Sequence, residues 1–422
     1  MLSHRINMVV NSVLHRIDLC VNIVYMTYIY RFAEKQLRSM LLEKEIVAVT
    51  GPRQAGKTTL VAHVLSGMEN TASYTFDKQS LVKEFKTDPD TFYDRYMKGK
   101  SIVFFDEIQY VKKSGTILKY LYDTYPSIKI VVSGSSAPDI AIQSLKYLVG
   151  RVLILEVTPF SLQEFISYKK PDLYNFIEDN KDTKIYEKEL QQVTSEYMTY
   201  GGYPKVVIES DYLKKELIIE NIYNTLFLRE VRDIAGLVES DKFISLLKSL
   251  AIIQGSQVDY KKLSEVTGYS FLSLKKYIKI LEDIYVCIKV SPYFKNKLKE
   301  ISKSPKIYFL DTGIRNYILN DFRTFIDPTR QDVGPVLEQV TLRCLGAPIK
   351  NVYYWRDKNQ KEIDFVLEGV GLVPNLCECK WAYETIKADT IESFKAIHNK
   401  IGAVMVVSFN PKIDGIPVWR VK

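Results

Sequence analysis

Cysteine is scarce in this sequence of 422 residues, and its five copies are scattered and odd in number. They are Cys20, Cys287, Cys344, Cys377 and Cys379. A small scaffold held by disulfides needs many cysteines, and a zinc site needs ligands at characteristic short spacings. Neither pattern is present. The sequence therefore indicates a protein of a reducing compartment, without a disulfide framework or a structural zinc site.

Long apolar runs are also missing. The first 29 residues are apolar in patches, but His15, Arg16 and Asp18 interrupt them well before the length that crosses a bilayer. They lack the small-residue cleavage pattern of a signal peptide. We interpret residues 1–29 as a loosely packed helical extension, or as the result of a start placed upstream of the true one at Met26. No other segment could span a bilayer, so no membrane partner is expected and the cytoplasm is the expected location.

Neither sign of charge dominates the composition, which has 58 Lys and Arg against 50 Asp and Glu and a net charge of +8. Hydrophobic residues make up 46% and charged residues 26%, as in ordinary globular proteins. The charge is concentrated between residues 261 and 306, where eleven lysines and four acidic residues give a net charge of +7. This indicates a polyanion partner such as DNA, although a solvated lysine-rich face is the alternative.

The middle of the N-terminal half alternates between apolar runs and helical patterns. The runs at 46–50, 102–105, 128–132 and 152–157 have the length of strands and are apolar on both faces. Such strands, separated by helices, are typical of a parallel sheet covered on both sides. We therefore predict an α/β fold whose first domain contains a parallel sheet.

A glycine-rich segment follows the first of these strands and fits the pattern G-x-x-x-x-G-K-[ST]. Its residues are Gly51, Pro52, Arg53, Gln54, Ala55, Gly56, Lys57 and Thr58. In such a P-loop, backbone N–H groups surround the phosphates, the lysine places its charge on the β- and γ-phosphates, and the hydroxyl ligates Mg²⁺. The sequence predicts binding of a nucleoside triphosphate, ATP with Mg²⁺.

The next two strands supply the expected partners of the P-loop. Asp106 ends one strand, where it would reach the Mg²⁺ shell, and Glu107 is placed to orient and polarise the attacking water. Ser133 ends the following strand. It is a candidate sensor of the γ-phosphate, and capping of the next helix is an equally good explanation.

These motifs, with several others, resemble a large family of uncharacterised bacterial and archaeal AAA-type ATPases that carry a winged helix and a C-terminal domain of unknown function. The matching segments are GPRQAGKTTL at 51–60, DEIQ at 106–109, SGSS at 133–136, GR at 150–151, PFS at 159–161 with Glu164, GGYP at 201–204, and YFLDTG at 308–313. The resemblance extends from about residue 30 to the C-terminus. It implies ATP binding, with Thr59 part of the motif.

The resemblance suggests roles for two further residues. In clamp-loader-like AAA ATPases, an arginine at the position of Arg151 acts as a finger on the nucleotide of a neighbouring subunit, which implies a homo-oligomer. The alternative is a surface salt bridge. In related signal-transducing ATPases, a Gly-x-Pro contacts the adenine side of the site, which makes Pro204 a candidate. An ordinary tight turn is its alternative.

The basic stretch has the order of a winged helix, with helices expected at 243–253, 260–267 and 271–283 and a strand at 285–290. Lys275, Lys276 and Lys279 lie away from the apolar stripe of the third helix. They would occupy the face that enters the major groove in DNA-binding members. Packing between domains is the alternative role.

The C-terminal residues 361–367 and 376–380 alternate polar and apolar side chains, as half-buried strands do. Asp364 followed by Glu378-x-Lys380 resembles the core of restriction-endonuclease-like folds, and Glu338 matches an extra acidic residue upstream. The resemblance implies that Glu338, Asp364 and Glu378 hold Mg²⁺, while Lys380 steers or activates water against a phosphodiester. Such domains can also lose their chemistry and keep their shape.

Together these patterns predict an N-terminal extension at 1–29, a P-loop ATPase core at 30–160, a helical lid at 161–240, a winged-helix region at 241–331 and a nuclease-like α/β domain at 332–422. Two functions are compatible with them. One is an ATPase that couples nucleotide state to DNA binding and DNA cleavage. The other is a nucleotide switch that binds protein partners, with the nuclease-like domain as an inert scaffold.

Overall fold

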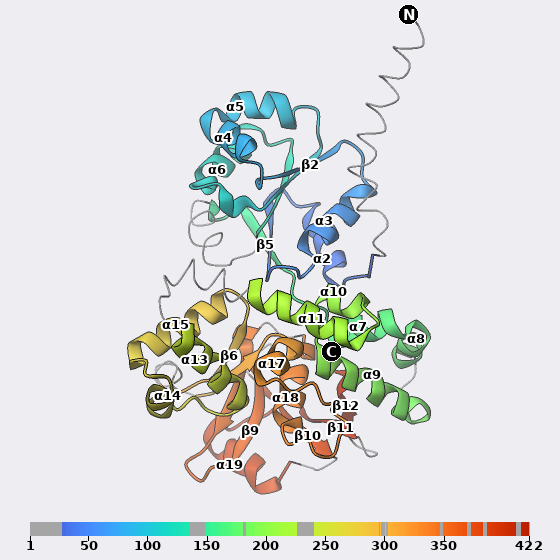
Figure 1. The fold of residues 1–422 in the computed structure, drawn as a ribbon, viewed down its shortest axis with the longest axis vertical. Coiled ribbons are helices and arrows are strands. Elements are labelled where there is room, and N and C mark those ends of the chain that lie inside the picture. Colours follow the sequence, from blue (N-terminus) through green and yellow to red (C-terminus); the bar gives the residue numbers. More distant parts are fainter. Residues whose placement is uncertain are drawn as a thin grey trace, which may run out of the picture.

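The chain forms two β-sheets that lie in separate halves of the molecule (Figure 1). The computed structural model describes residues 28–134, 148–179, 183–225, 240–294, 296, 300, 303–346, 349–368, 373–382, 386–410 and 415–421. Residues 1–27 of the predicted extension at 1–29 lie outside these ranges. So do Ser135 and Ser136 of the SGSS motif.

The first sheet is parallel throughout and has the strand order β2-β3-β4-β1-β5. Its strands are β1 (Ile46–Thr50), β2 (Thr71–Thr75), β3 (Ile102–Asp106), β4 (Lys129–Ser133) and β5 (Val152–Glu156). Every residue of β1, which lies between β4 and β5, is buried. This confirms the predicted parallel sheet, and four of its five strands lie within one or two residues of the predicted runs.

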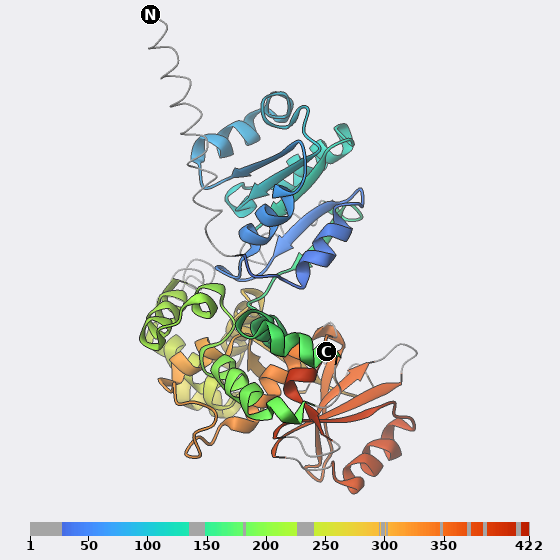
Figure 2. The ribbon, with the colours of Figure 1, turned by 90° about the vertical axis from the view of Figure 1, so that its right-hand side faces the viewer.

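Helices cover both faces of this sheet (Figure 2). They are α2 (Ala33–Met40), α3 (Lys57–Ser66), α4 (Gln79–Thr87), α5 (Pro89–Phe92) and α6 (Ser114–Thr124). Leu37 of α2 and Leu60 of α3 pack with Val47 and Val49 in one apolar core. A second core gathers Phe76, Phe85, Phe92, Phe105 and Leu121. The two cores fix β1 and β3, whose carboxyl ends carry the predicted nucleotide site.

The helices of the predicted lid pack against the C-terminal half. They are α7 (Leu162–Lys169), α8 (Pro171–Asp179), α9 (Glu187–Tyr200), α10 (Pro204–Ile208) and α11 (Tyr212–Tyr223). Phe165 and Tyr197 share a core with Val336, Tyr354 and Phe365. In Figure 2 these green helices accordingly lie against the orange and red elements.

The basic stretch forms three helices followed by an antiparallel strand pair, in the order predicted for a winged helix. The elements are α13 (Ser240–Ile252), α14 (Tyr260–Thr267), α15 (Phe271–Asp283), β6 (Cys287–Pro292) and β7 (Lys306–Phe309). Side chains cap two of the helices: Asp259 accepts hydrogen bonds from Lys261 N and Lys262 N, and Ser270 from Ser273 N. Polar N-caps of this kind satisfy backbone N–H groups that have no partner inside the helix.

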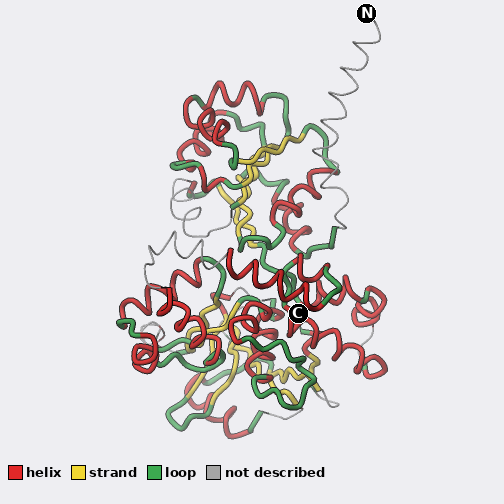
Figure 3. The backbone as a smooth tube through the Cα atoms, viewed as in Figure 1, coloured by secondary structure: helices red, strands yellow, loops and turns green. Residues whose placement is uncertain are grey.

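The second sheet joins the winged-helix region to the C-terminal region, which the sequence did not predict. Its order is β12-β11-β10-β9-β8-β6-β7, and β6 pairs with β8 in parallel through Ser291 and Tyr353. The other elements are α17 (Thr312–Leu319), α18 (Val333–Cys344), β8 (Val352–Arg356), β9 (Glu362–Glu368), β10 (Pro374–Ala382), α19 (Ala388–His398), β11 (Val404–Asn410) and β12 (Ile416–Pro417). In Figure 3, helices border these yellow strands. The two regions therefore share one sheet.

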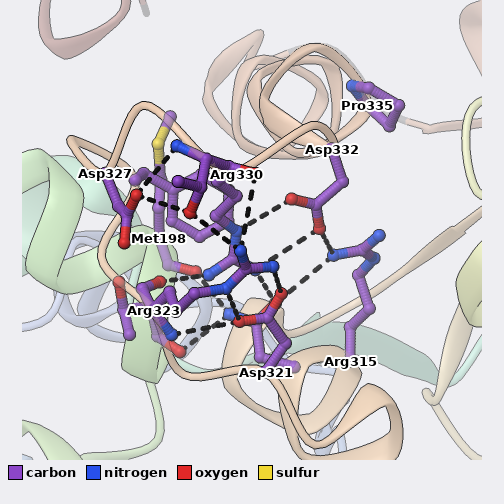
Figure 4. A network of polar contacts seen from close by, with 12 residues as sticks. Met198, Arg315, Asp321, Arg323, Asp327, Arg330, Asp332 and Pro335 are labelled. Atoms are coloured by element: carbon purple, nitrogen blue, oxygen red, sulfur yellow. Dashed lines mark hydrogen bonds and ion pairs between the residues drawn. The ribbon is translucent and has the colours of Figure 1, made fainter.

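A network of buried arginines holds the link between α17 and α18 (Figure 4). Arg330 lies 3.6 Å from the centroid of the Phe325 ring and donates to Asn316 Oδ1 at 2.8 Å. Asp332 accepts from both Arg330 and Arg315. Buried charges are tolerated only when they are paired and hydrogen-bonded, as they are here. The network fixes the start of α18, which carries Glu338.

Three of the motifs shared with the resembled family meet at the junction of the two halves. The Asp311 carboxylate accepts from Gly202 N at 2.8 Å, and Phe160 N donates to Gly202 O at 2.8 Å. A Cβ atom on Gly202 would lie 2.2 Å from Phe160 O, and one on Gly313 would lie 2.2 Å from Tyr200 O. These glycines are required by close packing. Asp311 also begins α17 as its N-cap, since its side chain accepts a hydrogen bond from Ile314 N.

Candidate functional site

The P-loop lies between β1 and α3, where the motif requires it. Gly51 has a φ of 138°, and a Cβ atom there would lie 1.9 Å from Val157 O. Gly56 has a φ of 92° and precedes the first residue of α3. Only glycine adopts such backbone conformations without strain and allows such close approach. The loop therefore curves over the amino end of α3, where the helix dipole favours an anion.

Lys57 directs its ammonium group into this loop. Its Nζ donates to Gly51 O at 2.9 Å and to Pro52 O at 2.8 Å. The side chain is buried, although the residue begins a helix. Its charge is therefore held at the mouth of the loop, where the resemblance places the β- and γ-phosphates.

Asp106 is fixed by donors from three elements. Thr58 Oγ1 donates to Asp106 Oδ2 at 2.8 Å, and Ser133 Oγ and the Glu107 backbone N donate to Oδ1. The hydroxyl and carboxylate oxygens of Thr58 and Asp106 are of the kind that Mg²⁺ prefers, so this pair fits the predicted ion. Ser133 therefore contacts Asp106, and its role as a sensor of the γ-phosphate stays a prediction. The residues from 135 on, where the alternative capping role would apply, lie outside the described ranges.

Glu107 follows Asp106 in the left-handed backbone region, with a φ of 57°. Gln109 Nε2 donates to its Oε2. Burial raises the pKa of Glu107, and the neighbouring Asp106 raises it further, while Lys57 and Arg53 lower it. A carboxylate with a raised pKa, held beside the phosphate site, suits the acceptance of a proton from water. Gln109 matched the resembled family, but a role for it was not predicted.

Arg31 is the main residue of this site that sequence reasoning missed. Its guanidinium donates to Ala55 O in the P-loop at 2.8 Å, to Thr158 O at 2.6 Å and to Glu164 Oε1 at 3.0 Å. Glu164 also closes the capping box of α7 with Ser161. Arg31 therefore joins the P-loop to the first helix of the second half. No local pattern marks it, because its three partners come from distant parts of the chain.

Pro204 borders a small apolar hollow beside the P-loop. The hollow is lined by Tyr28, Ile29, Arg31, Gly56, Thr59, Leu60, Phe160, Pro204 and Ile208. The structure thus brings the predicted Pro204 close to Gly56 and Thr59. Its contact with adenine stays a prediction.

Arg151 lies at the amino-terminal ends of the strands, whereas the P-loop lies at their carboxyl-terminal ends. It precedes β5, whose Val152 pairs with Ile46 at the start of β1, whereas the P-loop follows the end of β1. Its Nε lies 2.9 Å from Asp123 Oδ1, and both side chains are partly exposed. The surface salt bridge is therefore present. Arg151 cannot reach the P-loop of its own chain from this position, so the finger role across a subunit boundary stays a prediction.

The predicted C-terminal residues come together on β9, β10 and α18. Cys379 N donates to Asp364 Oδ2 at 2.8 Å, and Lys380 Nζ lies 3.0 Å from Glu378 Oε1. Glu338 accepts a hydrogen bond from Tyr308 Oη at 2.6 Å. Asp364 and Glu378 are both buried.

Lys306, which no motif indicated, places its ammonium group among these carboxylates. Its Nζ lies 2.6 Å from Glu362 Oε1, 3.7 Å from Glu338 Oε2 and 3.9 Å from Asp364 Oδ1, and 1% of its side chain is exposed. Lys306 begins β7, so the winged-helix region supplies it across the shared sheet. We call Lys306, Glu338, Glu362, Asp364, Glu378 and Lys380 the carboxylate cluster.

The electrostatics of the cluster are set by burial. Burial, with a further contribution from the charge of Asp364, raises the pKa of Glu338 to about 8 and that of Glu378 to about 7, although Lys306 acts to lower the first and Lys380 the second. In the part of the chain that the structure describes, no group of three His, Cys, Asp or Glu side chains is arranged to hold a metal ion. In this arrangement two lysines offset part of the negative charge of the four carboxyl groups. A metal-ligand role for Glu338, Asp364 and Glu378 stays a prediction.

Comparison with known families agrees with the nucleotide site. Residues 43–166 match a family model described as an AAA domain, and 191–324 and 333–417 match two domains of unknown function. The chain therefore contains an AAA-type P-loop ATPase domain followed by two domains of unknown function. This confirms the resemblance inferred from the motifs.

Its relatives are uncharacterised proteins. One, from Methanocaldococcus jannaschii, is 24% identical over 394 residues, covering 90% of this chain and 84% of that protein. Another, from Mycobacterium tuberculosis, is 25% identical over 345 residues, covering 80% of this chain and 71% of that protein. Among solved structures, a Walker-type ATPase of Pyrococcus abyssi matches with a TM-score of 0.46 and 16% identity, over 69% of this chain and 96% of that one.

Among the helices that the structure describes, none is both long enough and apolar enough to cross a bilayer.

Proposed function

We propose that this protein hydrolyses ATP and uses the nucleotide state to control the binding of DNA by its C-terminal half. The observation that carries the proposal is the direct contact between the strand that leads into the P-loop and the second half of the chain. Tyr285 Oη donates to Thr50 Oγ1 at 3.2 Å, and Thr50 is the last residue of β1 before the P-loop. Tyr285 lies in the turn between α15 and β6, the elements of the basic region.

Each residue of the nucleotide site has a defined part in this proposal. Lys57 and the P-loop N–H groups hold the β- and γ-phosphates in position, and Thr58 and Asp106 would hold Mg²⁺, which neutralises charge on the phosphates when bound. Glu107 orients a water molecule and accepts its proton as the water oxygen attacks the γ-phosphorus. The bond from that phosphorus to the bridging oxygen breaks, which yields ADP and phosphate.

Three contacts link this chemistry to the C-terminal half. Arg31 and Tyr285 contact the P-loop and the strand before it, as described above. Arg343, on α18, donates to Thr158 Oγ1 at 3.1 Å, to Pro159 O at 2.8 Å and to Leu310 O at 3.0 Å. A shift of the loop on nucleotide binding would therefore be transmitted to β6 and α18 through packed, hydrogen-bonded side chains.

The charge of the basic region supports DNA as the partner. Lys275, Lys276 and Lys279 are all exposed on α15, as the helical pattern predicted. Lys279 is paired with Asp283 and lies 3.5 Å from Glu282 Oε2. Lys275 and Lys276 are therefore the stronger candidates for phosphate contacts on this helix.

Tyr285→Phe is expected to abolish most of the effect of nucleotide on DNA affinity, because it removes the hydroxyl that contacts Thr50 and keeps the ring. The affinity for ATP should change little. The measurement is fluorescence anisotropy of labelled DNA with ADP and with a non-hydrolysable ATP analogue. Tyr212→Phe, at an exposed tyrosine of α11, is the matched control. If nucleotide changes the DNA affinity of Tyr285→Phe as much as that of the parent, this contact does not couple the two sites.

The finger role proposed for Arg151 predicts an oligomeric ATPase. Arg151→Ala should reduce turnover by about 1000-fold if the guanidinium stabilises the transition state across a subunit boundary. Mixing Arg151→Ala with Lys57→Ala subunits should restore part of the activity, since mixed interfaces combine an intact P-loop with an intact finger. If the active ATPase is a monomer and Arg151→Ala does not change its turnover, the finger role is wrong. Arg151 then acts only in the surface salt bridge with Asp123.

The second candidate function is a nucleotide switch for protein partners, with the nuclease-like domain inert. The position of Lys306 favours it, because the ammonium group lies among the carboxylates that metal-dependent cleavage would use. A cleavage assay with Mg²⁺ or Mn²⁺ distinguishes the two. Cleavage that is lost in Asp364→Ala, with ATP hydrolysis intact, would assign nuclease activity to the cluster. Cleavage that persists in this variant would come from a contaminant or from another site.

A further inference from the structure

A groove separates α15 from the edge of the C-terminal sheet. It has a volume of about 550 Å³, and its walls come from different parts of the chain. Phe271, Lys275 and Lys279 of α15 form one wall. Lys350 and Tyr353, at the start of β8, belong to the other, together with the residues that precede β7, among them Lys303.

Basic and aromatic side chains line this groove. Five lysines and two glutamates contribute to its surface, which gives an excess of three positive charges. Phe271 is 49% exposed, and Lys275 Nζ lies 4.5 Å from the centroid of its ring. Tyr260 meets Phe271 edge to face at 5.1 Å between ring centroids. In complexes with nucleic acids, basic side chains bind phosphates, and bases stack on aromatic side chains.

The shape of the groove favours a single strand over a duplex. The face of α15 that carries Lys275 and Lys279 is opposed by the C-terminal sheet and its edge, so a duplex placed against that face would meet the opposite wall. Lys276 is exposed on the same helix but does not line the groove. If α15 instead entered the major groove of a duplex, the contacts would have to come from Lys276, because Lys275 and Lys279 face the sheet.

The groove shares lining residues with two larger hollows. Glu282, Lys289 and Lys350 are shared with a hollow that is lined by Tyr285 and Arg343 at the ATPase junction. Lys303 and Ser304 are shared with a second hollow lined by Arg356. Arg356 Nε lies 3.5 Å from Glu362 Oε2 of the carboxylate cluster. The groove is therefore bordered by one hollow that includes Tyr285, the partner of Thr50, and by another that includes Arg356, the neighbour of the carboxylate cluster.

We propose that a single strand of nucleic acid lies in this groove, with its phosphates on Lys275, Lys303 and Lys350 and a base stacked on Phe271. The inference rests on the proposed function, because it specifies the form of nucleic acid bound and the residues that hold it. The strand is held jointly by the winged-helix region and the C-terminal sheet. A nucleotide-dependent movement at Tyr285 then changes the width of the groove and with it the affinity for the strand.

The test is binding of the full chain to a fluorescently labelled oligothymidylate and to a duplex of equal length, measured by anisotropy over a range of salt. The variant Lys275→Gln/Lys303→Gln/Lys350→Gln is compared with Lys83→Gln/Lys86→Gln/Lys188→Gln. The control set is exposed, lies outside the groove and changes the net charge equally. The groove variant should bind the single strand about 10-fold more weakly or worse, and its salt slope should fall by about 2, since each lost phosphate contact accounts for about 0.7. The control should bind like the parent.

A second comparison tests the stacking contact. Phe271→Ala should weaken single-strand binding by about 10-fold. Leu272→Ala, which removes the exposed apolar neighbour, should change it little. Equal binding by the groove and control triple variants would contradict the binding of a single strand in the groove. So would a preference for duplex that depends on Lys276. Either result would leave the proposal of DNA binding standing. Absence of binding to either nucleic acid at low salt would overturn the proposed function as well.

Discussion

Lys57→Ala is expected to reduce ATP hydrolysis by about 100-fold or more, because a preorganised positive charge is lost from the site of phosphoryl transfer. The side chain is buried in the P-loop and donates to Gly51 O and Pro52 O, so its charge is already in position before nucleotide binds. Turnover is measured by phosphate release, and nucleotide affinity by titration with a fluorescent ATP analogue. Affinity should fall together with turnover.

Two further variants separate binding from chemistry. Glu107→Gln should keep nucleotide affinity and slow hydrolysis, since the amide retains the shape of the side chain but cannot accept the proton of water. Lys100→Ala is the matched control, because Lys100 precedes β3 at the amino edge of the same sheet, away from the P-loop. Hydrolysis at the parental rate in both Lys57→Ala and Glu107→Gln would show that the nucleotide site is wrongly assigned.

Lys306→Met is expected to lower the free energy of unfolding by about 3–5 kcal/mol at pH 8, because it leaves buried carboxylates without their cation. Lys306 lies within 4 Å of Glu338, Glu362 and Asp364 and is almost fully buried. Lys358→Met, at an exposed lysine, should change stability by less than about 0.5 kcal/mol. Chemical denaturation followed by circular dichroism measures both.

The pH dependence of this effect has a definite sign. The pKa of Glu338 is raised to about 8 by burial, so below that pH the folded protein holds a proton that the unfolded chain releases near pH 4.3. Stability therefore falls as the pH rises from about 4.3 to 8, and the loss caused by Lys306→Met should be smaller at pH 5 than at pH 8. Adding Glu338→Gln should partly rescue Lys306→Met at pH 8. No rescue and no pH dependence would contradict the electrostatic account of the cluster.

The nucleotide site could be predicted closely from the sequence because its information is local. The P-loop is contiguous, and the apolar strands before Lys57 and Asp106 are marked by buried β-branched residues. β2 was missed, since Thr71–Thr75 is polar and lies at the edge of the sheet, where no apolar pattern is required. Arg31 was missed for a different reason. It acts through Ala55, Thr158 and Glu164, and nothing in its own neighbourhood indicates those partners.

The C-terminal half shows where sequence patterns stop. Alternation placed Asp364 and Lys380 on strands correctly, and the resemblance added Glu338 on its helix. The pairing of β6 with β8 could not be read from the sequence, because pairing of distant strands leaves no local pattern. That pairing brings Lys306 among the carboxylates and forms the groove beside α15. Both features therefore emerged only from the structure.

The measurement that tests the account most directly is the affinity for single-stranded DNA with Mg²⁺ and either ADP or a non-hydrolysable ATP analogue. Tyr285 joins the strand before the P-loop to α15 and β6, which line the groove, so the two nucleotide states should differ in affinity by about 5-fold or more, the usual range of coupling between sites. Lys57→Ala should remove the difference. Equal affinities in both states, with nucleotide shown to be bound in each, would contradict the proposal that ATP controls DNA binding.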